Sequence, residues 1–149
     1  MNIQCKENVL TPVDFIRLRI AVGRTATPQM QAKAALRTGL YDITAFCEGT
    51  AVAMGRLVGD GAMYWYIQDV AVLPEYQGKG IGKSIVERLL QHVYSCTPNG
   101  TFTTVGLMAA QGKEGFYEKL GFQAMPDAGS GAGMTRYIEK NWRNSSSDL

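Results

Sequence analysis

A glycine-rich turn that carries two lysines is the stretch of this chain whose residues are best suited to chemistry. It runs Gln77-Gly78-Lys79-Gly80-Ile81-Gly82-Lys83, between an apolar, β-branched run that ends at Pro74 and a segment with apolar residues at helical spacing. At the start of a helix, backbone N–H groups without partners meet the positive end of the helix dipole, and phosphate is the usual anion there. Lys79 and Lys83 add positive charge. The turn therefore predicts a phosphate-binding loop.

Spacing separates the phosphate-binding patterns that share this strand–turn–helix layout. A Walker-type loop needs a glycine five residues before Gly82, and this chain has Gln77 there. The dinucleotide fingerprint fits Gly78 and Gly80, but its third glycine position holds Lys83. A nucleotide-binding domain is therefore the weaker prediction.

The remaining pattern, Gln77-x-x-Gly80-x-Gly82, resembles the pyrophosphate-binding loop of the GCN5-related N-acetyltransferases (GNAT). The preceding Val70-Ala71-Val72-x-Pro74 and the long helical segment after the loop share in the resemblance. A second stretch, Lys113 to Phe122, looks like the other family signature, with Phe-Tyr on a helix and a Leu-Gly-Phe turn after it. The two signatures stand in the family's order, and the resemblance covers almost the whole chain.

The resemblance implies acetyl-CoA as co-substrate and no metal. Its pantetheine arm is expected between two parallel strands that splay apart beyond Val70 and near Met108, and its pyrophosphate on the amides of the loop. Glycines in that loop let backbone N–H groups approach the phosphate oxygens. The cofactor-binding residues that the resemblance indicates are Val70, Val72, Gln77, Gly78, Lys79, Gly80, Ile81, Gly82, Lys83 and Phe116.

The implied reaction is direct acyl transfer from a thioester to a primary amine within a ternary complex. Tyr117 matches the position of the family's tyrosine acid, which would protonate the leaving thiolate, and an amide near Val72 would stabilise the oxyanion. Asp69 is the one carboxylate on the strand that faces the acyl group, which makes it the candidate base. A structural role is at least as well supported for Asp69, and Tyr117 could simply pack its helix on the sheet.

For other residues near this strand, a functional and a structural interpretation both remain open. The aromatic run Tyr64-Trp65-Tyr66 could line an amine pocket, because aromatic faces attract cations, or form a cross-strand cluster. Tyr66 takes the place where some family members carry a glutamate. His92, the one histidine, lies inside the long helical segment and is expected to be a structural or surface residue.

The hydrophobic pattern predicts an α+β fold with the order β-α-α-β-β-β-α-β-α-β-β, which is the GNAT order. It implies a mixed, mostly antiparallel sheet with a splayed parallel pair, in a single domain over residues 1–140 with a polar tail at 141–149. The expected strands are 3–6, 40–47, 50–58, 62–72, 101–108, 122–125 and 134–138, and the expected helices are 12–22, 28–37, 80–94 and 111–120.

Composition narrows the function classes. A net charge of +2 and the lack of a basic run with interleaved aromatics disfavour nucleic-acid binding. Three scattered cysteines and no long apolar span indicate a cytoplasmic protein that does not enter a membrane. An exposed C-terminal edge strand would allow a homodimer. The acceptor is expected to be a small-molecule amine; an amino group of a protein, or a non-catalytic acyl-CoA-binding module on the same fold, is the alternative.

Overall fold

The computed structural model describes residues 1–142. They fall into two compact units, one from Met1 to Leu107 and one from Met108 onward. Seven of the nine residues in the expected tail, 143–149, lie outside the described part of the chain. The expectation of a single domain over residues 1–140 stays a prediction.

The first unit is built on a five-stranded sheet whose spatial order follows the sequence. Neighbouring strands pair antiparallel from β1 to β4, and β4 pairs with β5 in parallel. This confirms the mixed, mostly antiparallel sheet. The strands are β1 (Ile3–Glu7), β2 (Tyr41–Cys47), β3 (Thr50–Gly59), β4 (Tyr64–Val72) and β5 (Thr104–Gly106).

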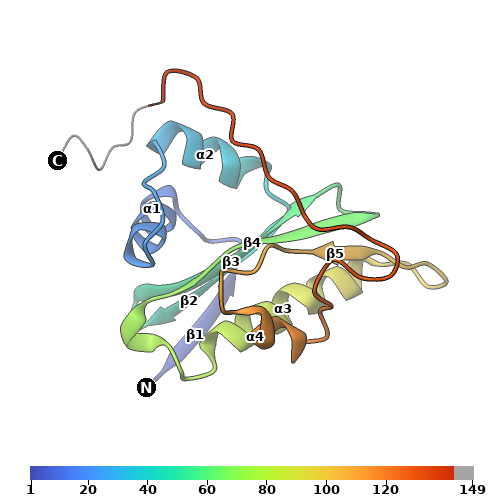
Figure 1. Ribbon diagram of the computed structural model, residues 1–149. Coiled ribbons are helices and arrows are strands. Elements are labelled where there is room, and N and C mark those ends of the chain that lie inside the picture. The colour runs from blue at the N-terminus through green and yellow to red at the C-terminus, as the bar shows by residue number, and fades with distance from the viewer. Residues whose placement is uncertain (143–149) are drawn as a thin grey trace. The chain divides into compact units, whose positions relative to one another are not determined.

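Helices cover both faces of this sheet (Figure 1). Helices α1 (Pro12–Ala21) and α2 (Gln29–Thr38) lie on one face, where Leu18 and Ala32 pack in one buried cluster with Met54 of β3. Helix α3 (Ile81–Cys96) lies on the other face, after a 3-10 turn, η1 (Pro74–Tyr76). The predicted N-cap of α1 is confirmed, since Asp14 N–H donates to Thr11 Oγ1 at 3.1 Å.

Gly55 of β3 is where α3 packs directly against the sheet. A Cβ added there would lie 2.6 Å from Ile85 Cγ2 and 3.1 Å from Leu89 Cδ1, two buried side chains of α3. Only a residue without a side chain allows this approach. The contact sets the distance between the sheet and the helix that begins at the glycine-rich loop.

In the second unit, the described residues form one short helix, α4 (Glu114–Glu118). It is shorter than the expected helix 111–120, because Gly112 has a left-handed φ of +86° that an α-helix cannot include. The helix ends at Glu118, three residues before Gly121. The left-handed turn expected at Gly121 is present: Gly121 N–H donates to Glu118 O and Phe122 N–H to Tyr117 O, around a φ of +94°.

The two last strands that the pattern predicts, 122–125 and 134–138, are absent from the described residues. Phe122 is held instead at the end of α4 by its bond to Tyr117 O. In the second segment Met134, Tyr137 and Ile138 are all exposed. A short strand needs a buried face to offset the entropy of ordering it, and this segment has none. The predictions of these two strands were wrong for that reason.

Gly55→Val should destabilise the first unit by about 1–3 kcal/mol, because the added methyl groups would enter the space that Ile85 and Leu89 fill. Urea unfolding followed by circular dichroism would measure it. Gly106→Ala in β5 is the matched control, since its Cβ would meet the Tyr66 ring at an ordinary 3.5 Å. An equal loss of stability in both variants would show that Gly55 is not a packing constraint.

Candidate active site

The glycine-rich loop adopts the geometry of an anion site at the start of α3. Gly78 and Gly80 have φ values of +74° and +81°, and Gly80 is the N-cap residue, with no side chain capping the helix. A Cβ at either glycine would meet nothing within 4 Å, so the backbone angle is what requires glycine. The first N–H groups of α3 have no partner inside the helix, and the uncapped end leaves them for an anion.

The predicted loop residues come together around this helix end. Ile81 is buried and anchors the first turn of α3, whereas Lys79 and Lys83 are exposed. Lys83 Nζ lies 3.9 Å from Glu87 Oε1, an exposed pair that restrains the lysine little. Two cations and a row of backbone amides fit the charge of a pyrophosphate group.

A side-chain bond ties the loop to the strand before it. Gln77 Nε2 donates to Val72 O at 2.9 Å across η1. In the same turn, a hydrogen bond with Cys47 raises the pKa of the Tyr76 phenol. The first loop residue is thus held against the end of β4, which fixes where the loop starts.

The edge of β4 next to the loop is open. Its parallel pairing with β5 ends at Tyr66 opposite Gly106, so residues 67–72 of β4 have no β5 partner. Leu73 N–H donates to Val52 O of β3, and successive residues of a strand direct their backbone groups to opposite edges. The backbone groups of Val70 and Val72 therefore face the open edge. The strands separate earlier than the predicted positions, Val70 and Met108.

A β-bulge interrupts β4 just before this edge. The pairing leaves Gly55 of β3 opposite both Asp69 and Val70 of β4, and Asp69 has a left-handed φ of +56°. The extra residue changes the alternation of side chains. Val70 lies against Gly55 on the α3 face, while the Asp69 carboxylate reaches arginines of β3 and α1 on the other face.

Three arginines surround the Asp69 carboxylate, whose side chain is 3% exposed. Arg56 Nε donates to Oδ2 at 3.1 Å, and Arg19 donates to Oδ1. Arg24 Nη1 lies 3.6 Å from Oδ1. A general base needs a lone pair that can reach the substrate, and here both oxygens are engaged by guanidinium groups. These contacts favour the structural role of Asp69 over catalysis.

We refer to Asp69, Arg19, Arg24 and Arg56 as the arginine cluster. The sequence interpretation included Asp69 and missed the arginines. The sequence did contain one indication of a buried ion pair. Arg56 is the one charged residue in the otherwise apolar stretch from Ala51 to Val58, and a charged side chain in such a stretch needs a buried partner.

The aromatic residues at the start of β4 differ in their exposure to solvent. Trp65 is buried, with its ring centroid 5.9 Å from that of His92 in α3, and the His92 ring stacks on Tyr41 at 3.7 Å. Burial, together with a hydrogen bond to Glu7, raises the pKa of Tyr41 to about 12. Trp65 and His92 thus belong to the contact between the sheet and α3, a structural role that differs from the cross-strand cluster expected of the aromatic run. Tyr64 is exposed.

The turn before β4 is ordered by one carboxylate. Asp60 Oδ1 accepts from the N–H groups of Ala62, Met63 and Tyr64 at 2.8–3.0 Å. These backbone donors, with Tyr64 the strongest, lower the pKa of Asp60. Asp60 therefore holds the loop between β3 and β4 in one shape at neutral pH.

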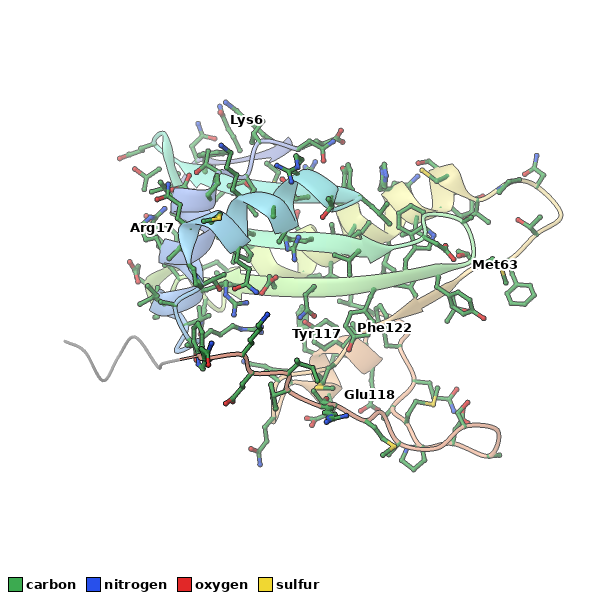
Figure 2. All side chains as sticks on the ribbon, turned by 90° about the horizontal axis from the view of Figure 1, so that it is seen from above. Lys6, Arg17, Met63, Tyr117, Glu118 and Phe122 are labelled. Carbon is green, nitrogen blue, oxygen red and sulfur yellow. The ribbon has the colours of Figure 1, made fainter. Side chains whose placement is uncertain are left out.

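In the second unit, Phe116 and Tyr117 belong to an aromatic group on α4. Their ring centroids are 4.9 Å apart, and Tyr117 meets Phe122 edge to face at 5.9 Å (Figure 2). These contacts hold the Tyr117 ring within the second unit; packing of its helix on the sheet stays a prediction. Its catalytic role stays a prediction.

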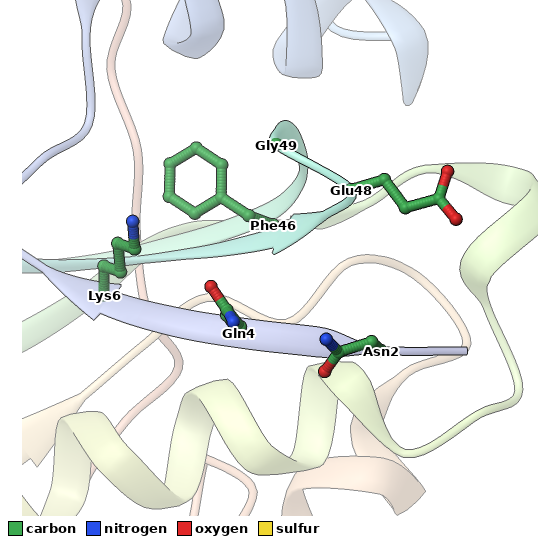
Figure 3. Close-up of a pocket in the computed structure, with 6 residues that line it drawn as sticks. All are labelled: Asn2, Gln4, Lys6, Phe46, Glu48 and Gly49. Atoms are coloured by element: carbon green, nitrogen blue, oxygen red, sulfur yellow. The ribbon is translucent and has the colours of Figure 1, made fainter.

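A polar hollow of about 250 Å³ lies beside β1, β2 and the turn after β2 (Figure 3). Its lining residues are Asn2, Gln4, Lys6, Phe46, Glu48 and Gly49. They lie in or next to β1, β2 and the turn after β2, and none of them belongs to the glycine-rich loop. Glu48 of this turn and its neighbour Cys47 interact with Tyr76, which directly precedes Gln77. The hollow is thus close to the turn that begins the loop but includes no residue of the loop.

Comparison with known proteins shows a family match over the part of the chain that contains the candidate site. A family model described as an acetyltransferase (GNAT) domain matches residues 41–124, more than half of the chain. The match includes β2 to β5, the loop, α3 and α4.

Two curated relatives illustrate the range of similarity. Serotonin N-acetyltransferase 2, chloroplastic, of Oryza sativa subsp. japonica is 36% identical over 89 residues, which cover 60% of this chain and 42% of that protein. The uncharacterized N-acetyltransferase ycf52 of Pyropia yezoensis is 30% identical over 115 residues, or 74% of this chain and 64% of that protein. The chain thus spans less than two thirds of the length of each.

Solved structures share the fold over nearly the whole chain. A probable acetyltransferase of unknown function from meticillin-resistant Staphylococcus aureus has a TM-score of 0.79 and 28% identity, covering 91% of this chain and all of that one. A GNAT family acetyltransferase from Streptococcus pneumoniae has a TM-score of 0.75 and 29% identity, covering 93% of this chain and all of that one.

Within residues 1–142, no helix is both long and apolar enough to cross a membrane. No group of three or more His, Cys, Asp or Glu side chains within that range is placed to hold a metal ion.

Asp69→Asn should destabilise the first unit by about 3 kcal/mol or more, because three guanidinium groups would lose their counter-charge. Asparagine tolerates a left-handed φ, so the change removes charge without adding backbone strain. Thermal and urea unfolding would measure the loss.

The matched control for this prediction is Asp14→Asn, which breaks an exposed pair with Arg17 and should cost less than about 1 kcal/mol. If Asp69→Asn left stability unchanged while abolishing turnover, Asp69 would be a catalytic group after all.

Proposed function

This chain belongs to the GNAT acetyltransferase family, and on that premise we propose that it transfers the acetyl group of acetyl-CoA to a primary amine. The observation that carries the proposal is the loop before α3, with left-handed glycines at positions 78 and 80, an uncapped helix end and two exposed lysines. It fits the pyrophosphate of the co-substrate, and the open edge of β4 beside it fits the extended, amide-bearing arm.

The acetyl group would then lie beside the bulge of β4. The backbone N–H of Val72 faces the open edge and could donate to the oxygen that becomes negative when the amine attacks. The amine nitrogen forms a bond to the acetyl carbon, the carbon–sulfur bond breaks, and the amine proton passes to water. Residues 67–83 contain no cysteine, which supports direct attack over a covalent acetyl-enzyme.

Tyr117 is proposed as the acid that protonates the departing thiolate. Its place in the second family signature supports this role, as does the packing of its ring by Phe116 and Phe122. A small-molecule amine is the proposed acceptor. A cytoplasmic location and a homodimer stay predictions.

Gly80→Asp should weaken acetyl-CoA binding at least ~100-fold, about 3 kcal/mol, because a carboxylate would stand among the amides meant for phosphate. Nothing within 4 Å obstructs the new Cβ, and aspartate is among the residues that best tolerate a left-handed φ, so the fold should survive. Isothermal titration with acetyl-CoA would measure affinity.

Two controls separate the causes of this loss. Gly80→Asn has the same shape without charge and should lose less. Gly100→Asp places the same charge on a glycine with φ +82° beyond α3 and should bind normally. Unchanged affinity in Gly80→Asp would remove the loop from the co-substrate site.

Tyr117→Phe should lower kcat by ~100-fold or more while the KM for acetyl-CoA changes little, since the ring packing remains and only the hydroxyl is lost. Release of free thiol would measure turnover. Tyr94→Phe, at an exposed tyrosine of α3, should behave like the wild type. Full activity of Tyr117→Phe would contradict the acid role, and acetyl-CoA binding without turnover on any amine would favour the non-catalytic module.

A further inference from the structure

The arginine cluster carries more positive charge than its one carboxylate can balance. Arg19, Arg24 and Arg56 face Asp69, and both carboxylate oxygens are already engaged. The next carboxylate, Asp42, interacts with Arg56, but burial raises the pKa of Asp42, and its Oδ1 accepts from Leu10 N–H at 3.2 Å. The cluster therefore keeps an excess of positive charge.

The three arginines differ in how fully their donors are used. Arg56 is buried, bonded to Asp69, within 3.5 Å of Ala35 O, and 5.3 Å from the centroid of the Phe15 ring. Arg19 Nε, in contrast, is shielded from solvent and has no partner among the described residues. Arg24 is 38% exposed and reaches Asp69 only at 3.6 Å. Donors of Arg19 and Arg24 are thus left for another anion.

The backbone holds these two arginines together. Gly23, with φ +87°, ends α1 in a turn in which Gly23 N–H donates to Ile20 O and Arg24 N–H donates to Arg19 O at 2.9 Å. The turn fixes the backbone of Arg24 next to that of Arg19. The backbone of the α1–α2 connection therefore places the two arginines side by side.

The cluster also lies close to the proposed site of reaction. Asp69 is next to Val70 and three residues before Val72, a span of about 10 Å along a strand. A group bound by Arg24 could belong to the same small molecule as an amine that reaches the acetyl group. A guanidinium pair with spare donors suits a carboxylate or a phosphate.

We propose that the acceptor of this enzyme is a short amine that also carries an anionic group, a carboxylate or a phosphate, bound by Arg24 and Arg19. This rests on the proposed function and narrows its substrate class.

Matched pairs of amines test the proposal. β-Alanine is compared with propylamine, and phosphoethanolamine with ethanolamine, at constant ionic strength, with thiol release as the readout. The anionic member of at least one pair should have a kcat/KM at least ~10-fold higher, and the pair that shows it tells carboxylate from phosphate. Equal kcat/KM values within both pairs would overturn the proposal.

Substitutions of single arginines test whether the preference for anionic amines comes from the arginine cluster. Arg24→Gln should lower kcat/KM for the anionic amine ~10-fold or more and leave the neutral amine unchanged, and Arg24→Lys should retain part of the preference. Arg37→Gln removes the same charge from an exposed position in the last turn of α2 and should keep the wild-type preference. If Arg37→Gln and Arg24→Gln lost the preference for the anionic amine equally, the preference would depend only on net charge, and the proposed anion site would be refuted.

A binding readout keeps this test separate from the proposed function. The anionic amine should raise the Tm of the wild type and of Arg37→Gln, but not of Arg24→Gln, against sodium chloride at the same ionic strength. This shift requires no turnover. If it appears although no amine is acetylated, the anion site stands and the acetyltransferase proposal fails; if all three proteins shift alike, the anion site fails.

Discussion

One buried carboxylate with three arginines is the interaction on which the first unit depends. Asp69 joins α1 through Arg19, the α1–α2 connection through Arg24, and β3 through Arg56. Ions removed from water lose several kcal/mol of solvation each, so such a group is stable only when the pairing is complete. The bulge that turns Asp69 toward the arginines is therefore fixed by electrostatics as well as by strand pairing.

The same bulge sets up the candidate site. Val70 and Val72 follow Asp69 directly, with backbone groups toward an edge that β5 does not cover, and Gln77 then binds Val72 O to begin the loop. A change in register at Asp69 would move every one of these groups. In the proposed function, the cofactor side and the acceptor side of the reaction would share this one short segment of β4.

Sequence reasoning succeeded where the determinants are local. The glycine turn before α3, the Thr11 cap, the left-handed turn at Gly121 and the first four strands each depend on residues within a few positions, and the structure has them. The arginine cluster joins Asp69 to a residue 50 positions away, and no local pattern encodes such a pair. The two last strands failed for the converse reason: Thr135, Tyr137 and Ile138 are residue types that favour strands, but burial decides whether a strand forms.

The engagement of Asp69 leaves the amine's proton without an obvious side-chain acceptor, and the arginine cluster offers a physical answer. An alkyl amine has a pKa near that of lysine, about 10.4, so roughly one molecule in a thousand is neutral at pH 7.4. Positive charge nearby disfavours the protonated form and lowers that pKa. An acceptor held through its anion would bring its ammonium group into this field, where losing the proton to water relieves repulsion. The guanidinium groups that recognise the anion would then also favour the neutral, nucleophilic amine.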